Sequence, residues 1–309
     1  MKVDSSSGAA LTALLSQVHL HASAFGASDL GAPWGVRTEG IEALGVYVVL
    51  QGSAVLVVRR RSVDLAAGDV VLVRAGVAHE LKDARSTRSV PFERLQRAAE
   101  GRARPFRWGG RGPRTRLVCG ALVLDAIDGA LFAAALPTHV HVSAARASPS
   151  LRSLLDGLAH EVADPGLAAP LVLTRFAELV FLHVLRACAE TDAGPLGWLR
   201  GLGHPRIARA LAAMYTAPER DWTVDSLAAK ATMSRSAFAE AFRAHVGEPP
   251  LEHLTAWRMR RAARLLASRD VPLKAIAAQV GYGSDEAFSR AFRAWAGEPP
   301  GAWRRRSLE

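Results

Sequence analysis

The sequence predicts a multidomain α and β protein, in which an antiparallel β-barrel is followed by a helical pair and then by an all-α double helix-turn-helix. Three observations predict this organisation. Short Val- and Leu-rich runs separated by turn residues fill the first half, the hydrophobic period becomes helical after Pro149, and a 14-residue pattern occurs twice near the C-terminus. The predicted domains are 1–148, 149–200 and 204–306.

The composition is that of an ordinary globular protein with an excess of positive charge. The 309 residues include 39 Lys and Arg against 29 Asp and Glu, for a formal net charge of +10. This excess favours an acidic partner, nucleic acid ahead of a membrane surface, although arginine enrichment in an Ala-rich chain is also typical of a GC-rich genome. Two cysteines are too few for a disulfide framework, and neither an export signal nor a membrane-spanning run is evident. We therefore expect a reduced, cytoplasmic protein that does not enter a membrane.

Short strands are expected to build the first 148 residues. Gly45–Val58 and Val63–Val73 each predict a strand pair, joined by tight turns at Gln51-Gly52 and Gly68-Asp69. Further strands are predicted at Ala78–Leu81, Arg116–Leu124 and His139–Val142. Together they predict a small antiparallel barrel or sandwich.

The segment Arg94–Arg116 interrupts these strands and is predicted to be a mobile loop. It contains eight arginines against the single acid Glu100, with several Gly, two Pro and no apolar periodicity. Two interpretations remain open: an arm that touches DNA, or a solvated insertion that happens to be basic. The second is favoured.

Two amphipathic helices are predicted after Pro149. The apolar positions of the first are Leu151, Leu154, Leu155 and Leu158, and those of the second are Leu173, Phe176, Leu179, Val180 and Val184. These two helices have more apolar surface than their contact with each other would bury. Two explanations stay open: a dimer interface, or packing on the sheet of the same chain.

The repeated pattern is the most specific feature of the sequence. Ala237–Pro250 reads AFAEAFRAHVGEPP and Ala287–Pro300 reads AFSRAFRAWAGEPP, which match at ten of fourteen positions. Two copies of one structural unit are therefore expected.

Each copy predicts a helix, a tight turn and a second helix. In the first, Thr223 and Ser234 are the expected N-caps, and Phe238 and Phe242 lie at i and i+4 of the second helix. In the second copy, Pro272 opens a helix, Gly281-Tyr282-Gly283 forms the turn, Ser284 caps the next helix, and that helix carries Phe288 and Phe292.

One long helix over Leu251–Ala267 is predicted to join the two copies. Its length of about 24 Å is of the order needed to place two helices in successive major grooves of one duplex. With the phenylalanines buried, polar side chains that can reach bases or phosphates point outward. The candidate DNA-contacting residues are Arg235, Ser236, Glu240, Arg243, Arg258, Ser284, Asp285, Ser289, Arg290 and Arg293. An ordinary solvated helix face is the alternative for any one of them.

The C-terminal hundred residues closely resemble the AraC/XylS family of transcription regulators. The resemblance rests on Trp222-Thr223-Val224, Met233 to Phe238, Gly247 to Pro250, Trp257-Arg258-Met259 and Val280-Gly281-Tyr282 through Pro299-Pro300. It implies a fold with two DNA-reading helices. Glu240 stands where many members carry Arg, whereas Arg290 fits that pattern, so an Arg-type base contact is not expected from position 240.

The N-terminal half resembles the cupin-type sensor domain often attached to these regulators. The matching segments are Val49 to Ser53, Leu65 to Val73, Thr115 to Gly120 and Leu136-Pro137, with His79 and His141. The resemblance therefore implies a cupin-like barrel. The metal-binding first cupin motif is absent, because Tyr47 and Val49 occupy its place. No catalytic residue, metal or cofactor is therefore predicted.

Three residues of this half are candidates for sensing an effector or a redox signal: His79, Cys119 and His141. His139 and His141 share a strand face and His79 is a possible third metal ligand, although polar residues lining a sheet are the favoured explanation. Positive charge near Cys119 would lower the pKa of its thiol, but a buried small hydrophobic residue is favoured there and at Cys188.

The sequence as a whole predicts a sequence-specific DNA-binding transcription regulator that is controlled by a small-molecule or redox signal at its N-terminal domain. The expected partners are double-stranded promoter DNA, an unidentified small-molecule effector, RNA polymerase and a second copy of the chain. One alternative is a metal-dependent cupin enzyme with a DNA-tethering tail. Another is a non-enzymatic interaction protein that uses the helical pair.

Overall fold

The computed structural model describes residues 5–16, 18, 20–99, 106–189, 197–267 and 271–308. Its contacts divide the chain into two compact units. We call His19–Gly194 the β unit, and Met1–Val18 together with Pro195–Glu309 the helical unit.

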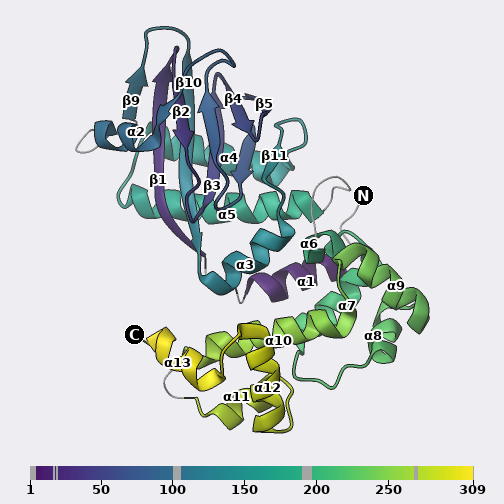
Figure 1. The fold of residues 1–309 in the computed structure, drawn as a ribbon. Helices are drawn as coiled ribbons and strands as arrows, with labels where there is room; N and C mark the ends of the chain where they lie inside the picture. Colours follow the sequence, from purple (N-terminus) through teal and green to yellow (C-terminus); the bar gives the residue numbers. More distant parts are fainter. Residues whose placement is uncertain are drawn as a thin grey trace. The chain divides into compact units, whose positions relative to one another are not determined.

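Two sheets form the β unit (Figure 1). In spatial order, the six-stranded sheet consists of β11 (His139–Val142), β6 (Val70–Val73), β3 (Leu44–Gln51), β10 (Arg114–Leu124), β1 (Leu20–Gly31) and β9 (Phe106–Gly109). The five-stranded sheet consists of β5 (Arg61–Ala66), β4 (Ser53–Val58), β7 (His79–Lys82), β2 (Gly35–Thr38) and β8 (Val90–Pro91). Neighbours are antiparallel, except that β9 is parallel to β1 and β8 to β2.

The predicted strands are present, but the two predicted strand pairings are wrong. The turn at Gln51-Gly52 joins β3 to β4, and the turn at Gly68-Asp69 joins β5 to β6, and in each case the two strands belong to different sheets. β3 pairs instead with β10 and β6, while β4 pairs with β5 and β7. The alternation of apolar and polar residues along a strand identifies which face is buried, but it does not identify the neighbouring strand. The sequence pattern therefore could not distinguish a hairpin within one sheet from a connection between two sheets.

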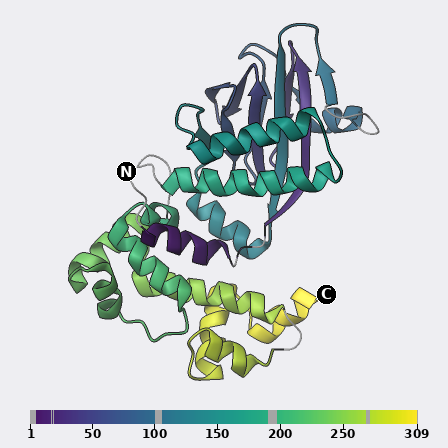
Figure 2. The ribbon, with the colours of Figure 1, turned by 180° about the vertical axis from the view of Figure 1, so that it is seen from behind.

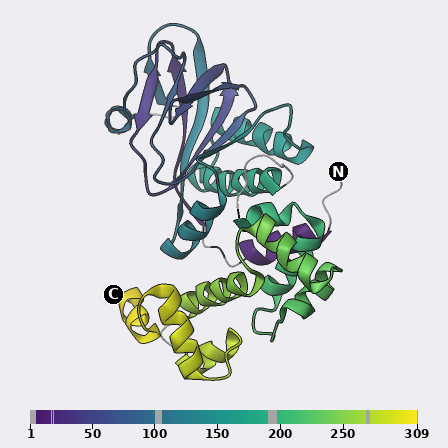
Figure 3. The same cartoon turned by 45° about the vertical axis from the view of Figure 1, so that its right-hand side comes forward.

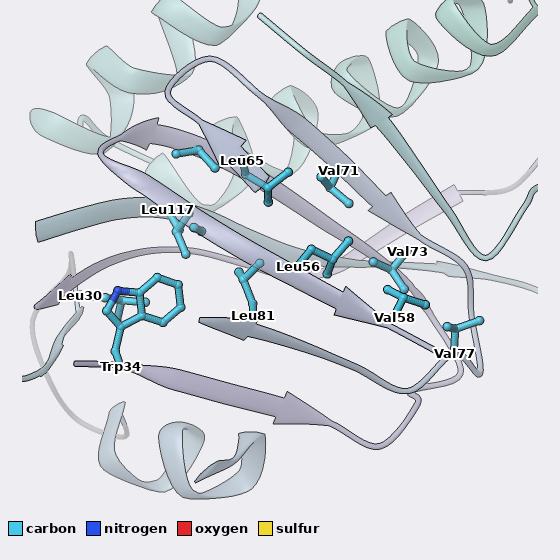
Figure 4. Packing of buried hydrophobic residues seen from close by; sticks show 12 residues of the cluster. Leu30, Trp34, Leu56, Val58, Leu65, Val71, Val73, Val77, Leu81 and Leu117 are labelled. Atoms are coloured by element: carbon cyan, nitrogen blue, oxygen red, sulfur yellow. The ribbon is translucent and has the colours of Figure 1, made fainter. Parts of the chain in front are cut away.

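The core of the β unit lies between the two sheets. Leu56 on β4 and Val71 on β6 are completely buried there, as is Leu117 on β10, and Trp34 is 2% exposed. Figure 4 shows these side chains between the strands, with Leu81 close to Leu56. The predicted sandwich or barrel is therefore confirmed.

Helices cover the outer face of the six-stranded sheet. α5 (Ala169–Ala189) packs on this sheet, mainly on β1, and α4 (Pro149–Ala163) packs on α5, as Figure 2 shows. Val180 and Val184 are buried in this contact, whereas Leu179 is 46% exposed, contrary to its predicted place on the apolar face. The helical pair thus packs on its own sheet. A third helix, α3 (Ala126–Ala135), precedes β11 and was not predicted.

The described part of Arg94–Arg116 is ordered, so the predicted mobile loop is wrong there. Phe92–Ala99 forms the helix α2, because Phe92 and Leu95 lie one turn apart and give it a half-buried face. β9 and the start of β10 follow, and Arg114 Nε donates to Asp29 Oδ1 at 2.6 Å. Glu100 and the arginines at 102 and 104 lie outside the described residues.

The helices of the helical unit are α1 (Ser5–Leu15), α6 (Gly197–Leu202), α7 (Pro205–Thr216), α8 (Val224–Ala231), α9 (Arg235–Val246), α10 (Pro250–Leu266), α11 (Leu273–Gln279), α12 (Asp285–Ala296) and α13 (Pro300–Leu308). Among the described residues, the unit thus contains the five expected helices, α8 to α12, and four that were not predicted, α1, α6, α7 and α13. The unpredicted α1 packs on α7, and Ser7 Oγ donates to the Leu202 carbonyl at 2.7 Å. Among the described residues, no helix has the length and apolarity needed to cross a membrane.

Candidate nucleic-acid interface and cavity

The first helix-turn-helix consists of α8 and α9. Thr223 Oγ1 accepts from the amide of Ser226 at 3.1 Å, and Ser226 Oγ accepts from the amide of Thr223 at 2.9 Å, which is a reciprocal capping box. Thr232 takes a left-handed conformation at the turn (φ +52°), and Ser234 then caps α9 through the amide of Ala237. Both predicted N-caps are confirmed.

The second helix-turn-helix repeats this construction in α11 and α12. Gly281 has φ +82° at the turn, a conformation that costs glycine little. Ser284 Oγ accepts from the amide of Ala287 at 3.2 Å at the start of α12. Pro272 precedes α11 as its N-cap residue.

The Gly-Glu-Pro-Pro sequence ends both reading helices in the same way. Gly247 and Gly297 are left-handed C-caps, with φ +94° and +79°. The glutamate that follows anchors a neighbouring helix in each copy. Glu248 Oε1 lies 2.7 Å from Nδ1 of the buried His253 on α10, and Glu298 pairs with Arg306 on α13.

Four phenylalanines fix which faces of α9 and α12 point outward. Phe238, Phe242, Phe288 and Phe292 are each completely buried, and the ring centroids lie 5.6 Å apart in the first pair and 5.8 Å apart in the second. Since the two pairs occupy equivalent positions, the opposite helix faces must be presented to solvent in the same way.

Most of the candidate DNA-contacting residues lie on those outward faces. The exposed ones are Arg235, Ser236, Glu240, Arg243, Ser284, Arg290 and Arg293, while Asp285 and Ser289 are half-buried. Arg235 forms an ion pair with Asp225 on α8 at 3.1 Å, and both side chains are exposed. A pair this exposed contributes little to stability, so Arg235 is free to exchange Asp225 for a phosphate.

Arg258 differs from the other candidates because the fold already uses its guanidinium. Its Nε donates to the Pro218 carbonyl at 2.7 Å and its Nη2 to the Arg220 carbonyl at 2.8 Å. The side chain also lies over the ring of Tyr282, 5.8 Å from its centroid. These contacts join α10 to the loop before α8 and to the second turn, so a structural role is favoured over the predicted DNA contact.

α10 connects the two helix-turn-helix units, as Figure 3 shows. Its 17 residues give a length of about 25 Å, close to the prediction. Leu254, Trp257 and Leu266 of this helix are buried. The helix packs against α9 of the first unit and against α11 and α12 of the second. The separation of α9 and α12 by one groove repeat stays a prediction.

A cavity of about 750 Å³ opens within the β unit. It is lined by residues of β1, β2, β3, β7, β9 and β10, and α2 contributes Phe92, Leu95 and Gln96. His79 and Cys119, two of the three predicted effector residues, line it together, whereas His141 does not. Neither Trp34 nor α2 was predicted from the sequence to belong to such a site. The i, i+3 spacing of Phe92 and Leu95 was the available signal for the helix.

His79 forms a polar contact with Tyr47 inside this cavity. Its Nδ1 lies 2.8 Å from the Val77 carbonyl, which can only accept, so Nδ1 carries the proton. In the neutral ring Nε2 then accepts from the Tyr47 hydroxyl, at 2.5 Å. Burial raises the pKa of Tyr47 and lowers the pKa of His79, so both are uncharged at neutral pH.

The three histidines considered as metal ligands are not brought together. His79 binds Tyr47, whereas His141 Nε2 lies 2.8 Å from Oδ2 of the buried Asp69, which also accepts from the amides of Ala66 and Ala144. Among the described residues, no three His, Cys, Asp or Glu side chains are arranged to hold a metal ion. His141 therefore supports the β5–β6 turn.

Of the two interpretations of Cys119, the favoured one, a small hydrophobic residue, agrees with the structure, whereas the alternative of a lowered thiol pKa does not. Burial raises the pKa of this thiol to about 12, and it does the same at Cys188. The segment around Cys119 packs against the apolar core, which disfavours a thiolate. The structure thus disfavours redox sensing by this residue.

Both thiols should consequently react slowly in the folded protein. At pH 8 we expect iodoacetamide to modify Cys119 and Cys188 at least ten times more slowly than free cysteine, because only the thiolate attacks. Mass spectrometry of timed samples measures both sites, and the urea-unfolded chain is the control. Modification of Cys119 at the unfolded rate would contradict this assignment.

Comparisons with known protein families agree with the folds of the β unit and the helical unit. Residues 9–190 match the family described as Cupin, and residues 227–306 match the family described as Helix-turn-helix domain. A protein of Streptomyces antibioticus named as an AraC-like transcription regulator is 34% identical over 303 residues, covering 96% of this chain and 97% of that protein. The chain belongs to the AraC/XylS family of transcription regulators.

This AraC/XylS-family regulator is also similar to a second curated regulator and to a solved DNA-binding domain. It is 29% identical to the HTH-type transcriptional regulator AlkR of Acinetobacter baylyi over 304 residues, covering 96% of this chain and 99% of that protein. The crystal structure of the DNA-binding domain of AdpA in complex with a target DNA is 35% identical over 32% of this chain and 88% of that chain, with a TM-score of 0.30.

Proposed function

We propose that this regulator reads promoter DNA with α9 and α12, each placed in a major groove. The observation that carries the proposal is the duplicated unit, in which both copies bury two phenylalanines and expose arginines at equivalent positions. Arg243 and Arg293 are such a pair. Exposed arginines on a capped helix can bind phosphates or guanine edges.

The β unit is proposed to hold the controlling signal, a small molecule, in its cavity. For control to occur, the molecule must bind two states of the protein unequally and so change the presentation of the reading helices. The raised pKa of Cys119 favours a small molecule over a redox signal. Such a regulator works in the cytoplasm, and a homodimer and a contact with RNA polymerase stay predictions.

A metal-dependent cupin enzyme gains no support from the described residues, since His79, His139 and His141 are not assembled into a ligand set. The interaction protein that uses the helical pair is disfavoured too, because α5 packs on the sheet.

Salt dependence tests the proposed DNA binding. Each neutralised phosphate lowers the logarithm of the binding constant by about 0.9 per logarithmic unit of salt, so contacts from Arg235, Arg243, Arg290 and Arg293 give a slope near −3.6. Gel-shift titrations of the full chain against genomic promoter fragments, at two salt concentrations and without added effector, measure it. Binding that prefers no fragment over random duplex at either salt concentration rejects the proposal.

A further inference from the structure

Arg258 contacts both helix-turn-helix units from the helix that joins them. We infer that it is a positioning residue for DNA binding, which fixes the separation of α9 and α12 and thereby the spacing of the two half-sites that the regulator accepts. This inference rests on the function proposed above, in which both helices read one duplex.

The two helix-turn-helix units have little direct packing on each other. Among the described residues, α8 and α9 make no substantial contact with α11 or α12. Instead α9 packs on α10 from the first unit, and α11 and α12 pack on it from the second. Two bodies that share one helix can tilt about it unless further contacts tie them together.

On the side of the first unit, Arg258 binds the loop that leads into α8. Its Nε and Nη2 donate to the carbonyls of Pro218 and Arg220, at 2.7 and 2.8 Å. The Arg220 carbonyl also accepts from the amide of Trp222 at 2.8 Å, and the next residue, Thr223, caps α8. The guanidinium therefore holds the segment that sets where α8 begins.

On the side of the second unit, Arg258 lies against the turn between α11 and α12. Its guanidinium carbon is 5.8 Å from the ring centroid of Tyr282, and that ring makes an edge contact with Phe288 at a centroid distance of 5.9 Å. Phe288 is completely buried on the inward face of α12. A planar guanidinium can donate two hydrogen bonds and lie over an aromatic ring at the same time, whereas the compact ammonium of lysine cannot.

Gly281 shows how closely the loop, the turn and the guanidinium approach one another. Its φ is +82°, and a Cβ at this position would lie 2.7 Å from Arg258 Nη2 and 2.7 Å from the carbonyl oxygen of Glu219. Both distances are far shorter than an ordinary contact of about 3.5–4.0 Å. The loop before α8 and the turn before α12 therefore meet around Arg258, with no room for a side chain at position 281.

A fixed separation of α9 and α12 makes binding sensitive to the spacing of the half-sites. One base pair inserted between the half-sites moves the second of them by about 3.4 Å and turns it by about 35° around the duplex. The unaltered chain can follow this change only by opening the contacts of Arg258. A chain without those contacts is already free to adjust.

Binding to duplexes of different spacing tests the inference. A duplex that the protein selects from a random pool is compared with two derivatives, in which one base pair is inserted or deleted midway between the two guanine clusters that the protein protects from methylation. The full chain, R258M and R261M are each titrated by fluorescence anisotropy. R258M keeps an unbranched side chain but loses the guanidinium. R261M is the control, because Arg261 is also half-buried on α10 and carries the same charge.

We expect either derivative to bind the unaltered chain about thirtyfold more weakly than the selected duplex does, because the two helices can no longer engage together. R258M should bind the selected duplex about tenfold more weakly than the unaltered chain, since two charge-assisted hydrogen bonds are lost. Its further loss on the derivatives should be only about threefold, so that both proteins bind the derivatives about equally. R261M should keep the thirtyfold preference.

An undiminished preference in R258M would overturn the inference, because a loss of stability alone lowers affinity equally at every spacing. No spacing preference in the unaltered chain, or an equal loss of preference in R261M, would overturn it too. Should R258M fail to fold, Y282L decides instead: it removes the ring beneath the guanidinium, and an unchanged preference in that variant contradicts the inference. Failure of the proposed function looks different, since the unaltered chain would then prefer no duplex over random sequence.

Discussion

Replacing Phe242 with alanine is expected to destabilise the helical unit by about 3–5 kcal/mol. The ring is completely buried and lies against Phe238 and His253, with centroids 5.6 and 5.7 Å away. Its loss leaves a cavity at the point where α9 packs on the unit. Because domains are stable by only about 5–15 kcal/mol, a large part of that margin would be lost. Calorimetry of the full chain should show a lower unfolding transition for the helical unit.

The adjacent residue provides the matched control. Arg243 is exposed, so Arg243→Ala should change stability by less than about 0.5 kcal/mol while weakening DNA binding. The two substitutions thus separate the buried face of α9 from its reading face. If Phe242→Ala left the unfolding transition unchanged, the assigned orientation of α9 would be wrong.

Removing Arg290 and Arg293 together should weaken binding to a preferred duplex on the order of a hundredfold, because base-reading and phosphate-binding contacts are lost at once. Both side chains are exposed on α12, whose buried side is fixed by Phe288 and Phe292. The binding constant, measured by fluorescence anisotropy with a labelled duplex, gives the loss. Competition with random duplex shows how much of it is sequence-specific.

A double variant of the β unit controls for net charge. Arg59 and Arg60 are exposed on the turn between β4 and β5, and replacing both by alanine removes the same charge. This variant should bind the duplex within about twofold of the unaltered chain at moderate salt, since exposed charges that make no contact with the duplex are screened. Equal losses in the two double variants would mean that bulk charge, not α12, drives the binding.

The helical unit could be predicted closely because its signals are local. The caps at Thr223, Ser234 and Ser284 and the paired phenylalanines act within one or two turns of helix, and the repeat specifies them twice. The role of Arg258 was missed because its carbonyl partners lie 38 and 40 residues away in the chain.

The β unit was less predictable because its organisation depends on distant pairing. β1 contains Gly, Ser and Ala, which favour strands weakly, yet pairing with β10 along its length makes it a strand. α3 has a local signal, since Asp125 caps it through the amide of Asp128, but that signal was overlooked. The cavity could not be predicted, since it requires Trp34, Tyr47 and Cys119 from separate strands and loops to converge.

Methylation protection tests most directly whether α9 and α12 occupy successive major grooves of one duplex. Dimethyl sulfate attacks guanine N7 in the major groove, so a helix bound there protects it. On a duplex selected by the protein from a random pool, we predict two protected clusters about 10 base pairs apart on one face. Arg243→Ala should remove protection in one cluster and Arg293→Ala in the other. A single cluster, or loss of the same cluster in both variants, would contradict the account.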